Sequence, residues 1–69
     1  MPLSLAGLNN EVTIRKINGN EEVKHHLGNL GFVVGAVVSI VNELDGNVIV
    51  SIKDSRVAIS KSMAAKILV

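Results

Sequence analysis

The sequence contains no cysteine among its 69 residues. Disulfide bonds and zinc sites built from cysteine thiolates are therefore excluded, so no such cross-link can stabilise this short chain. A core drawn from fewer than about 70–80 residues rarely contributes more than a few kcal/mol of net stability. The absence of cysteine also agrees with a reducing compartment.

Aromatic residues are almost absent too, because Phe32 is the only one. The formal net charge is +1, and the chain has no basic run. Nucleic-acid-binding modules usually combine a basic stripe with aromatic side chains on which bases stack, and proline-recognising grooves are lined with aromatics. The composition disfavours a nucleic-acid-binding small barrel and a peptide-binding SH3-like adaptor, and both stay open as alternatives.

Long hydrophobic runs are also missing. The longest nearly continuous one, Phe32–Val41, is interrupted by Ser39, whereas a membrane-spanning helix needs about 20 apolar residues. No basic residue precedes Arg15, so the chain does not show the charged start of a secretory signal. We therefore expect a soluble cytoplasmic protein that does not insert into a membrane.

The first half of the chain predicts one strand and one helix. Alternating polar and apolar residues indicate a half-buried strand over residues 11–17. Asn20 is a candidate N-cap for a helix that ends at Gly31, a residue suited to the left-handed conformation after a helix. Within this helix Gly28 costs about 1 kcal/mol relative to alanine, and we interpret it as a point of close approach to the strand beneath.

The second half is β-rich. Strands are predicted over residues 36–42, 47–53, 57–60 and 67–69, with a hairpin turn at Asp45-Gly46 and a helical turn over residues 61–66. Five short strands therefore accompany one α-helix after the first strand and a short helical turn before the last. Such strands most often close into a barrel, because closure removes unpaired edges. We expect one mainly β domain covering residues 1–69.

Apolar residues make up 48% of the chain, more than a small core can hold. The surplus is concentrated in LGFVVG, a joint between elements that would normally be polar. Neighbouring side chains diverge, so we expect Phe32 in the core and Val33 or Val34 at the surface, in a patch that Leu44 of the hairpin extends. A partner or weak self-association would cover this patch.

Metal-binding and catalytic signals are weak. His25 and His26 are adjacent on a helix and point about 100° apart, so they are poorly placed to share one metal. Glu21 and His25 share a helix face and are the candidate pair for a weak surface site. No nucleophile, base and carboxylate set and no phosphate-binding glycine loop occurs, so an enzyme is not expected.

Two stretches, HLGNLGFVVGAVVSIV and SRVAISKSMAAKILV, give the chain from Leu27 onward a distinctive pattern. In this pattern the chain resembles the FeoA family, small cytoplasmic proteins of bacterial ferrous iron uptake. HLGNLGFVVGAVVSIV is similar to the family's pattern of Leu, Leu-Gly-apolar, a second Gly and a β-run. SRVAISKSMAAKILV is similar to its later pattern of Arg, an Ala-aliphatic pair, a polar turn and a closing Ile-x-Val, and LSLAGL resembles its leader. Two positions depart, since Val34 stands where the family often has proline and His26 where it often has arginine.

The resemblance implies an SH3-like barrel that works beside FeoB, a membrane transporter with a cytoplasmic GTP-hydrolysing domain. We therefore expect a non-catalytic accessory protein without a cofactor, which contacts FeoB and modulates its GTPase or transport activity. The candidate contact residues are Phe32, Val33, Val34, Leu44 and Arg56. Arg56 is predicted in an exposed turn, and an arginine supplied in trans can stabilise the charge that develops during GTP hydrolysis. An ordinary solvated arginine remains the alternative.

Overall fold

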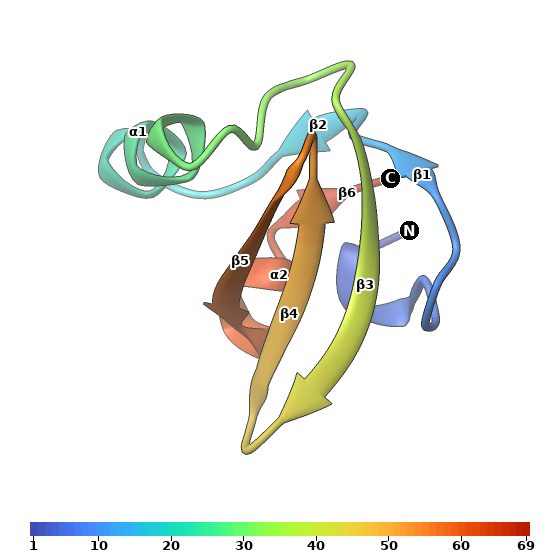
Figure 1. The fold of residues 1–69 in the computed structure, drawn as a ribbon. Helices are drawn as coiled ribbons and strands as arrows, with labels where there is room; N and C mark the ends of the chain where they lie inside the picture. Colours follow the sequence, from blue (N-terminus) through green and yellow to red (C-terminus); the bar gives the residue numbers. More distant parts are fainter.

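The computed structural model describes residues 1–69 and wraps two small antiparallel sheets and three helical segments around one apolar core (Figure 1). In chain order the elements are η1 (Leu3–Leu5, a 3-10 helix), β1 (Val12–Thr13), β2 (Lys16–Ile17), α1 (Glu21–Asn29), β3 (Val37–Leu44), β4 (Asn47–Ile52), β5 (Ser55–Ser60), α2 (Lys61–Ala64) and β6 (Ile67–Leu68). The larger sheet has the strand order β1-β3-β4-β5, and β2 pairs with β6 in the smaller one.

The strand predicted over residues 11–17 is divided between the two sheets. The Ile14 N–H donates to the Ala36 carbonyl at 2.9 Å, while the Arg15 N–H donates to the Leu68 carbonyl at 2.7 Å. The backbone therefore changes hydrogen-bond partner between two adjacent residues, from the β3 side to β6. The structure accordingly has six strands where the sequence predicted five.

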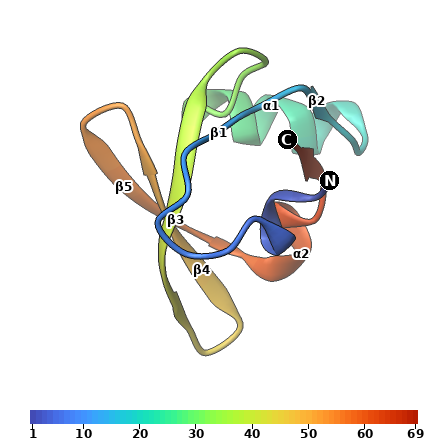
Figure 2. The same cartoon turned by 90° about the vertical axis from the view of Figure 1, so that its right-hand side faces the viewer.

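The predicted closure of the barrel is wrong, although the mainly β architecture is confirmed. In the larger sheet β1 and β5 are the edges. In the smaller sheet β2 pairs with β6, and Leu68 of β6 also forms an isolated bridge with Pro2. The side of the core opposite β3 and β4 is covered instead by η1 and α2 (Figure 2). Helix α2 packs against β4, β5 and η1, so helical segments cover the core where the strands leave it open.

The core is one cluster of buried apolar side chains to which both halves of the chain contribute. On β4 the alternation predicted from the sequence is confirmed, because Val48, Val50 and Ile52 are buried. The full cluster consists of Leu3, Ala6, Ile14, Leu27, Phe32, Val38, Ile40, Val48, Val50, Ile52, Ile59, Ala64 and Ile67. No polar or charged side chain is buried, so apolar packing holds the interior together.

Helix α1 begins and ends as predicted. The Asn20 side chain accepts a hydrogen bond from the Val23 N–H at 2.9 Å, which satisfies one of the free N–H groups of the first turn. Gly31 follows the helix with φ of +101°, a left-handed conformation that favours glycine. The prediction for Gly28 is wrong, because a Cβ atom at this position would meet no other heavy atom within 4 Å.

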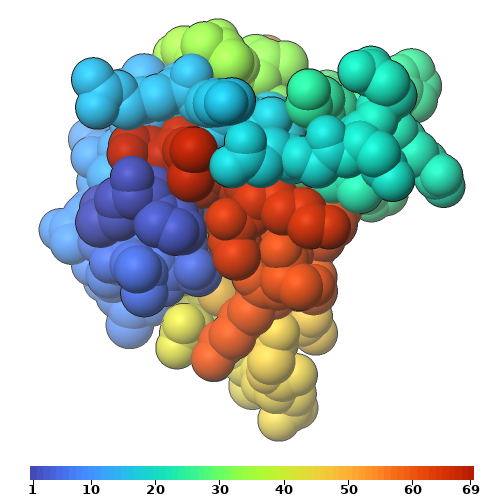
Figure 3. Space-filling view, turned by 180° about the vertical axis from the view of Figure 1, so that it is seen from behind, coloured from blue at the N-terminus to red at the C-terminus, as the bar shows by residue number.

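The remaining turns follow the local sequence. Asp45 and Gly46 have φ values of +50° and +80°, as a two-residue hairpin between right-twisted strands requires. Ser60 caps α2, since its Oγ accepts from the Met63 N–H at 3.2 Å. The two ends of the chain also meet, because the Val69 N–H donates to the Met1 carbonyl at 2.7 Å. Figure 3 shows the N-terminal and C-terminal segments side by side and the β3–β4 hairpin projecting beyond them.

Candidate functional site

The turn between α1 and β3 contains three consecutive large apolar residues, Phe32–Val34, and presents two of them to solvent. Phe32 is completely buried, whereas Val33 is 49% and Val34 67% exposed. The split between core and surface is therefore confirmed. Phe32 has no exposed area with which to contact a partner, because its side chain fills the core. The prediction that Phe32 is a contact residue is therefore wrong.

Backbone hydrogen bonds hold this turn in place. The Ala36 N–H donates to the Val33 carbonyl at 3.0 Å, which closes the turn around Val34. The Gly35 N–H donates to the Ile14 carbonyl at 2.8 Å, and Ile14 in turn donates to Ala36. The turn is thereby fixed to the strand beside it, and the two valines project from a backbone with its own hydrogen-bond partners.

Val37 adds a third exposed valine that the sequence analysis missed. It is the first residue of β3, lies opposite Thr13 in the sheet, and is 50% exposed. Because Val38 and Ile40 face the core, the two-residue period of a strand already places Val37 on the outer face. We call Val33, Val34 and Val37 the valine surface.

Leu44 does not extend the valine surface. It is 61% exposed, but it is the last residue of β3, seven residues beyond Val37. At about 3.3 Å per residue this separates the two by about 23 Å along the strand, close to the full width of a molecule measuring 28 × 24 × 22 Å. Figure 1 shows the β3–β4 hairpin and the α1–β3 turn at opposite ends of β3.

Arg56 lies in a strand and not in the predicted turn. The β4–β5 turn consists of Lys53 and Asp54, and Arg56 is the second residue of β5, opposite Ser51. The side chain is exposed. Because Ile52 pairs with Val38, the β4–β5 turn lies at the same end of the sheet as the valine surface. Lys53 and Arg56 thus bring two positive charges to that end, and Asp54 brings one negative charge.

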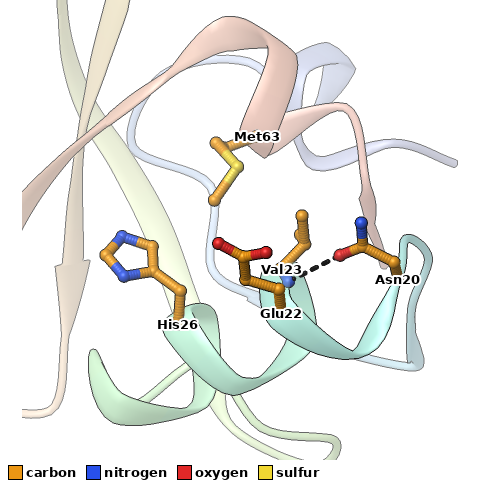
Figure 4. Close-up of a pocket in the computed structure, with 5 residues that line it drawn as sticks. All are labelled: Asn20, Glu22, Val23, His26 and Met63. Atoms are coloured by element: carbon orange, nitrogen blue, oxygen red, sulfur yellow. Dashed lines mark hydrogen bonds between the residues drawn. The ribbon is translucent and has the colours of Figure 1, made fainter.

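A separate pocket of about 350 Å³ lies between α1 and α2 (Figure 4). Its lining residues are Asn20, Glu22, Val23, His26 and Met63. The predicted surface pair, Glu21 and His25, is exposed on α1 and does not line this pocket. Helix α1 packs against the core through Val23 and Leu27. This orientation turns Glu22 and His26 toward α2 in place of the predicted pair.

Groups of several metal-ligating side chains do not occur in the structure. It brings together no group of three or more His, Cys, Asp or Glu side chains that would hold a metal ion. The longest helix, α1, has nine residues, and none of the helices combines the length and hydropathy needed to cross a membrane.

A comparison with models of protein families shows to which family this chain belongs. The model of the FeoA domain family matches residues 1–69, the whole of the sequence. The chain belongs to the FeoA domain family. The resemblance seen in the glycine-flanked turn and the C-terminal segment is thereby confirmed.

Similar proteins agree with membership of the FeoA family. The chain is 32% identical over 68 residues to a putative Fe(2+) transport protein A of Methanocaldococcus jannaschii, covering 99% of this chain and 83% of that protein. A crystal structure of an iron uptake regulatory protein (FeoA) superposes with a TM-score of 0.87 at 27% identity, covering 96% of this chain and 88% of the other. The chain is thus a small FeoA-family protein, and the relative at 32% identity carries the name of an Fe(2+) transport protein.

The fold is shared more widely than the sequence. FeoA of Stenotrophomonas maltophilia, solved in complex with zinc and described as an SH3 domain protein, has a TM-score of 0.84 at 24% identity, covering 99% of this chain and 87% of that one. At this identity the likeness concerns the fold alone. The SH3-like architecture is confirmed, with two separate sheets in place of a closed barrel.

Proposed function

We propose that this protein is a non-catalytic, cytoplasmic accessory protein of ferrous iron transport that contacts the GTP-hydrolysing part of a FeoB-type transporter. Residues 1–69 act as one domain in this proposal. The observation that carries it is the valine surface, three exposed apolar side chains at one end of the sheet. Membership of a family associated with Fe(2+) transport supplies the context.

The energetics favour contact with another protein at this surface. Burying a valine side chain completely contributes about 1.5–3 kcal/mol, and Val34 still exposes 67% of its area. The rigid turn adds little entropic cost on binding, because its backbone is already hydrogen-bonded to Ile14. The β4–β5 turn at the same end of the sheet carries Lys53 and Arg56 beside one carboxylate, Asp54, and this excess of positive charge would favour an acidic partner surface.

Binding to the isolated cytoplasmic domain of the transporter tests the contact. We expect Val34→Lys to weaken binding at least about tenfold, or about 1.4 kcal/mol, in a calorimetric titration. Leu44→Lys is the matched control, because Leu44 is 61% exposed but lies at the other end of β3. Equal losses in the two variants, or no binding by the parent protein, would show that the valine surface is not the contact.

The role of Arg56 is tested separately. If its guanidinium acts on GTP hydrolysis in trans, Arg56→Ala should abolish stimulation of the transporter's GTPase while leaving binding through the valines in place. Lys61→Ala is the control, since Lys61 is also exposed but begins α2, where its N–H donates to the Gly46 carbonyl at the hairpin end of the sheet. If Arg56→Ala stimulates the GTPase as strongly as the parent protein, Arg56 has no role in GTP hydrolysis, while the proposed contact through the valines is unaffected.

A further inference from the structure

Strand β5 is an edge of the larger sheet, and part of its backbone has no hydrogen-bond partner within the molecule. Its six residues pair with β4 and with no other strand. The pair next to the Lys53–Asp54 turn is Ile52 with Ser55. Because this pair closes a two-residue turn, its members exchange both of their backbone hydrogen bonds.

The alternation of an antiparallel ladder then determines which groups of β5 point outward. Residues bonded to the neighbouring strand alternate with residues whose N–H and C=O point the other way. Counting from Ser55, Val57 and Ile59 are bonded to β4, while Arg56 and Ala58 point to the free edge. Both of these are exposed, and no hydrogen bond from a turn or loop reaches their backbone. In Figure 2 the first half of β5 also stands clear of the helices.

The usual protections of a sheet edge are missing from β5. Natural edge strands are kept short, bulged, interrupted by proline or given inward-pointing charges. The other edge of the larger sheet, β1, has only two residues. In contrast, β5 has six residues, contains no proline and keeps one register with β4 along its whole length. Its single charged residue, Arg56, lies on the face opposite the buried Ile59.

The sequence of β5 suits antiparallel pairing with a second copy of itself. A two-fold axis at Val57 places Arg56 of each copy opposite Ala58 of the other, so the outward N–H and C=O groups of both residues find partners. On the outer face each arginine side chain then lies beside a methyl group, and no like charges stand directly opposite within the strand. On the core side the two half-buried Val57 side chains meet.

We propose that this protein forms a weak homodimer in which two β5 strands pair antiparallel about Val57 and join the larger sheets into one continuous sheet. A two-fold contact uses the same surface of both copies and closes at two, because the pairing occupies both β5 edges. A single strand pair is a small interface, which is typical of transient association. The pairing uses no residue of the valine surface, so it is separate from the contact with the transporter.

The charges around the paired strands keep the association weak. The Lys53–Asp54 turn of one copy lies near Lys61, at the start of α2, of the other. Asp54 offsets one of the two lysines, and the two Arg56 side chains add further positive charge. Salt screens the remaining repulsion. We therefore expect the association to strengthen as the salt concentration rises.

Rapid amide exchange with solvent, measured by ¹⁵N NMR, tests the pairing residue by residue. As the protein concentration rises into the millimolar range, exchange should slow at Arg56 and Ala58, while sedimentation velocity shows a shift from monomer to dimer. The amides of Val57 and Ile59 are the reference. They are bonded to β4 in the monomer and should be protected from rapid exchange at every concentration.

Substitutions at Ala58 separate strand pairing from other kinds of contact. Ala58→Glu should strengthen the dimer and Ala58→Lys should weaken it, each by about 2- to 30-fold, because the new side chain lies beside Arg56 of the other copy and the pair occurs twice. Ala58→Pro should abolish association, since it removes an N–H that points away from β4. Val34→Lys is the matched control and should leave association unchanged. If the proline variant does not fold, the two charged variants at this exposed position decide.

Four results would overturn the proposal. They are a monomer at millimolar concentration in high salt, slowed exchange at the valine surface in place of Arg56 and Ala58, failure of Ala58→Glu to strengthen the dimer, and loss of association in Val34→Lys. The first would show that the β5 edge stays unpaired, and the others would place the contact elsewhere. None would bear on the contact with the transporter, which is measured with the transporter's own domain.

Discussion

Gly28 is a position where a single methyl group should stabilise the protein. It is the eighth of the nine residues of α1, its φ is not positive, and an added Cβ atom would meet nothing within 4 Å. Alanine is favoured over glycine in helices by about 0.8–1 kcal/mol, and the substitution also restricts the unfolded chain. Because the position is near the helix end, we expect Gly28→Ala to raise the free energy of unfolding by about 0.5–1 kcal/mol.

Thermal and urea denaturation followed by circular dichroism measure this change. For a domain of this size the expected gain corresponds to a rise in Tm of about 2–8 °C. The urea midpoint should increase while the m-value stays the same, since the surface exposed on unfolding hardly changes.

Gly31→Ala is the matched contrast, three residues further along the same segment. Gly31 has φ of +101°, and its added Cβ atom would lie 3.4 Å from Ile52 Cδ1. The left-handed backbone alone costs an L-residue about 1–2 kcal/mol, so this variant should be less stable than the parent. The reasoning is wrong if Gly28→Ala is neutral or destabilising, or if both variants change the free energy of unfolding in the same direction. Either result would show that backbone conformation and free space around the Cβ position do not determine which glycine tolerates alanine.

Three further substitutions test the core, the helix cap and the hairpin by urea denaturation. Phe32→Ala should lower the free energy of unfolding by about 3–5 kcal/mol, which is much of the roughly 3–10 kcal/mol typical for a chain of this length. Val33→Ala, at the exposed neighbouring position, should change it by less than about 0.5 kcal/mol. Asn20→Ala should cost about 1 kcal/mol, and Asn20→Ser should restore most of it, because serine also accepts from the backbone. Gly46→Ala should cost about 1–2 kcal/mol, because Gly46 has φ of +80°. Equal losses of stability in Phe32→Ala and Val33→Ala would contradict the packing argument. The capping argument fails if Asn20→Ser is no more stable than Asn20→Ala, and the turn argument fails if Gly46→Ala is neutral.

Features set by neighbouring residues could be predicted from the sequence. The Asn20 cap, the left-handed Gly31 and the Asp45-Gly46 turn depend on backbone preferences within a few residues, and each is confirmed. The inward face of β4 followed from its two-residue period. The resemblance to the FeoA family rested on such local patterns too, which explains why it identified the fold before any contact was known.

Features set by distant partners could not be predicted in the same way. The first strand divides at Ile14 and Arg15 because Ala36 and Leu68 receive their hydrogen bonds, and nothing within residues 11–17 specifies those partners. Likewise, the helical pattern allowed both Glu–His pairs on α1. Only the position of Met63, about forty residues away, distinguishes the pair that lines a pocket from the pair that faces solvent.

Both candidate sites depend on the segment between β2 and β3, which stands to one side of the sheets in Figure 1. The pocket lies against the first two turns of α1, and the valine surface begins after its end. The sheets and α2 provide the frame that holds this segment, through the hydrogen bond from Gly35 to Ile14 and the burial of Leu27 and Phe32. Because the pocket faces α2 and the valine surface lies beyond Gly31, Val34→Lys and His26→Gln alter separate surfaces. His26→Gln should therefore leave transporter binding unchanged, and the double variant should bind the transporter as weakly as Val34→Lys alone; a further loss in the double variant would show that the two surfaces are coupled through α1.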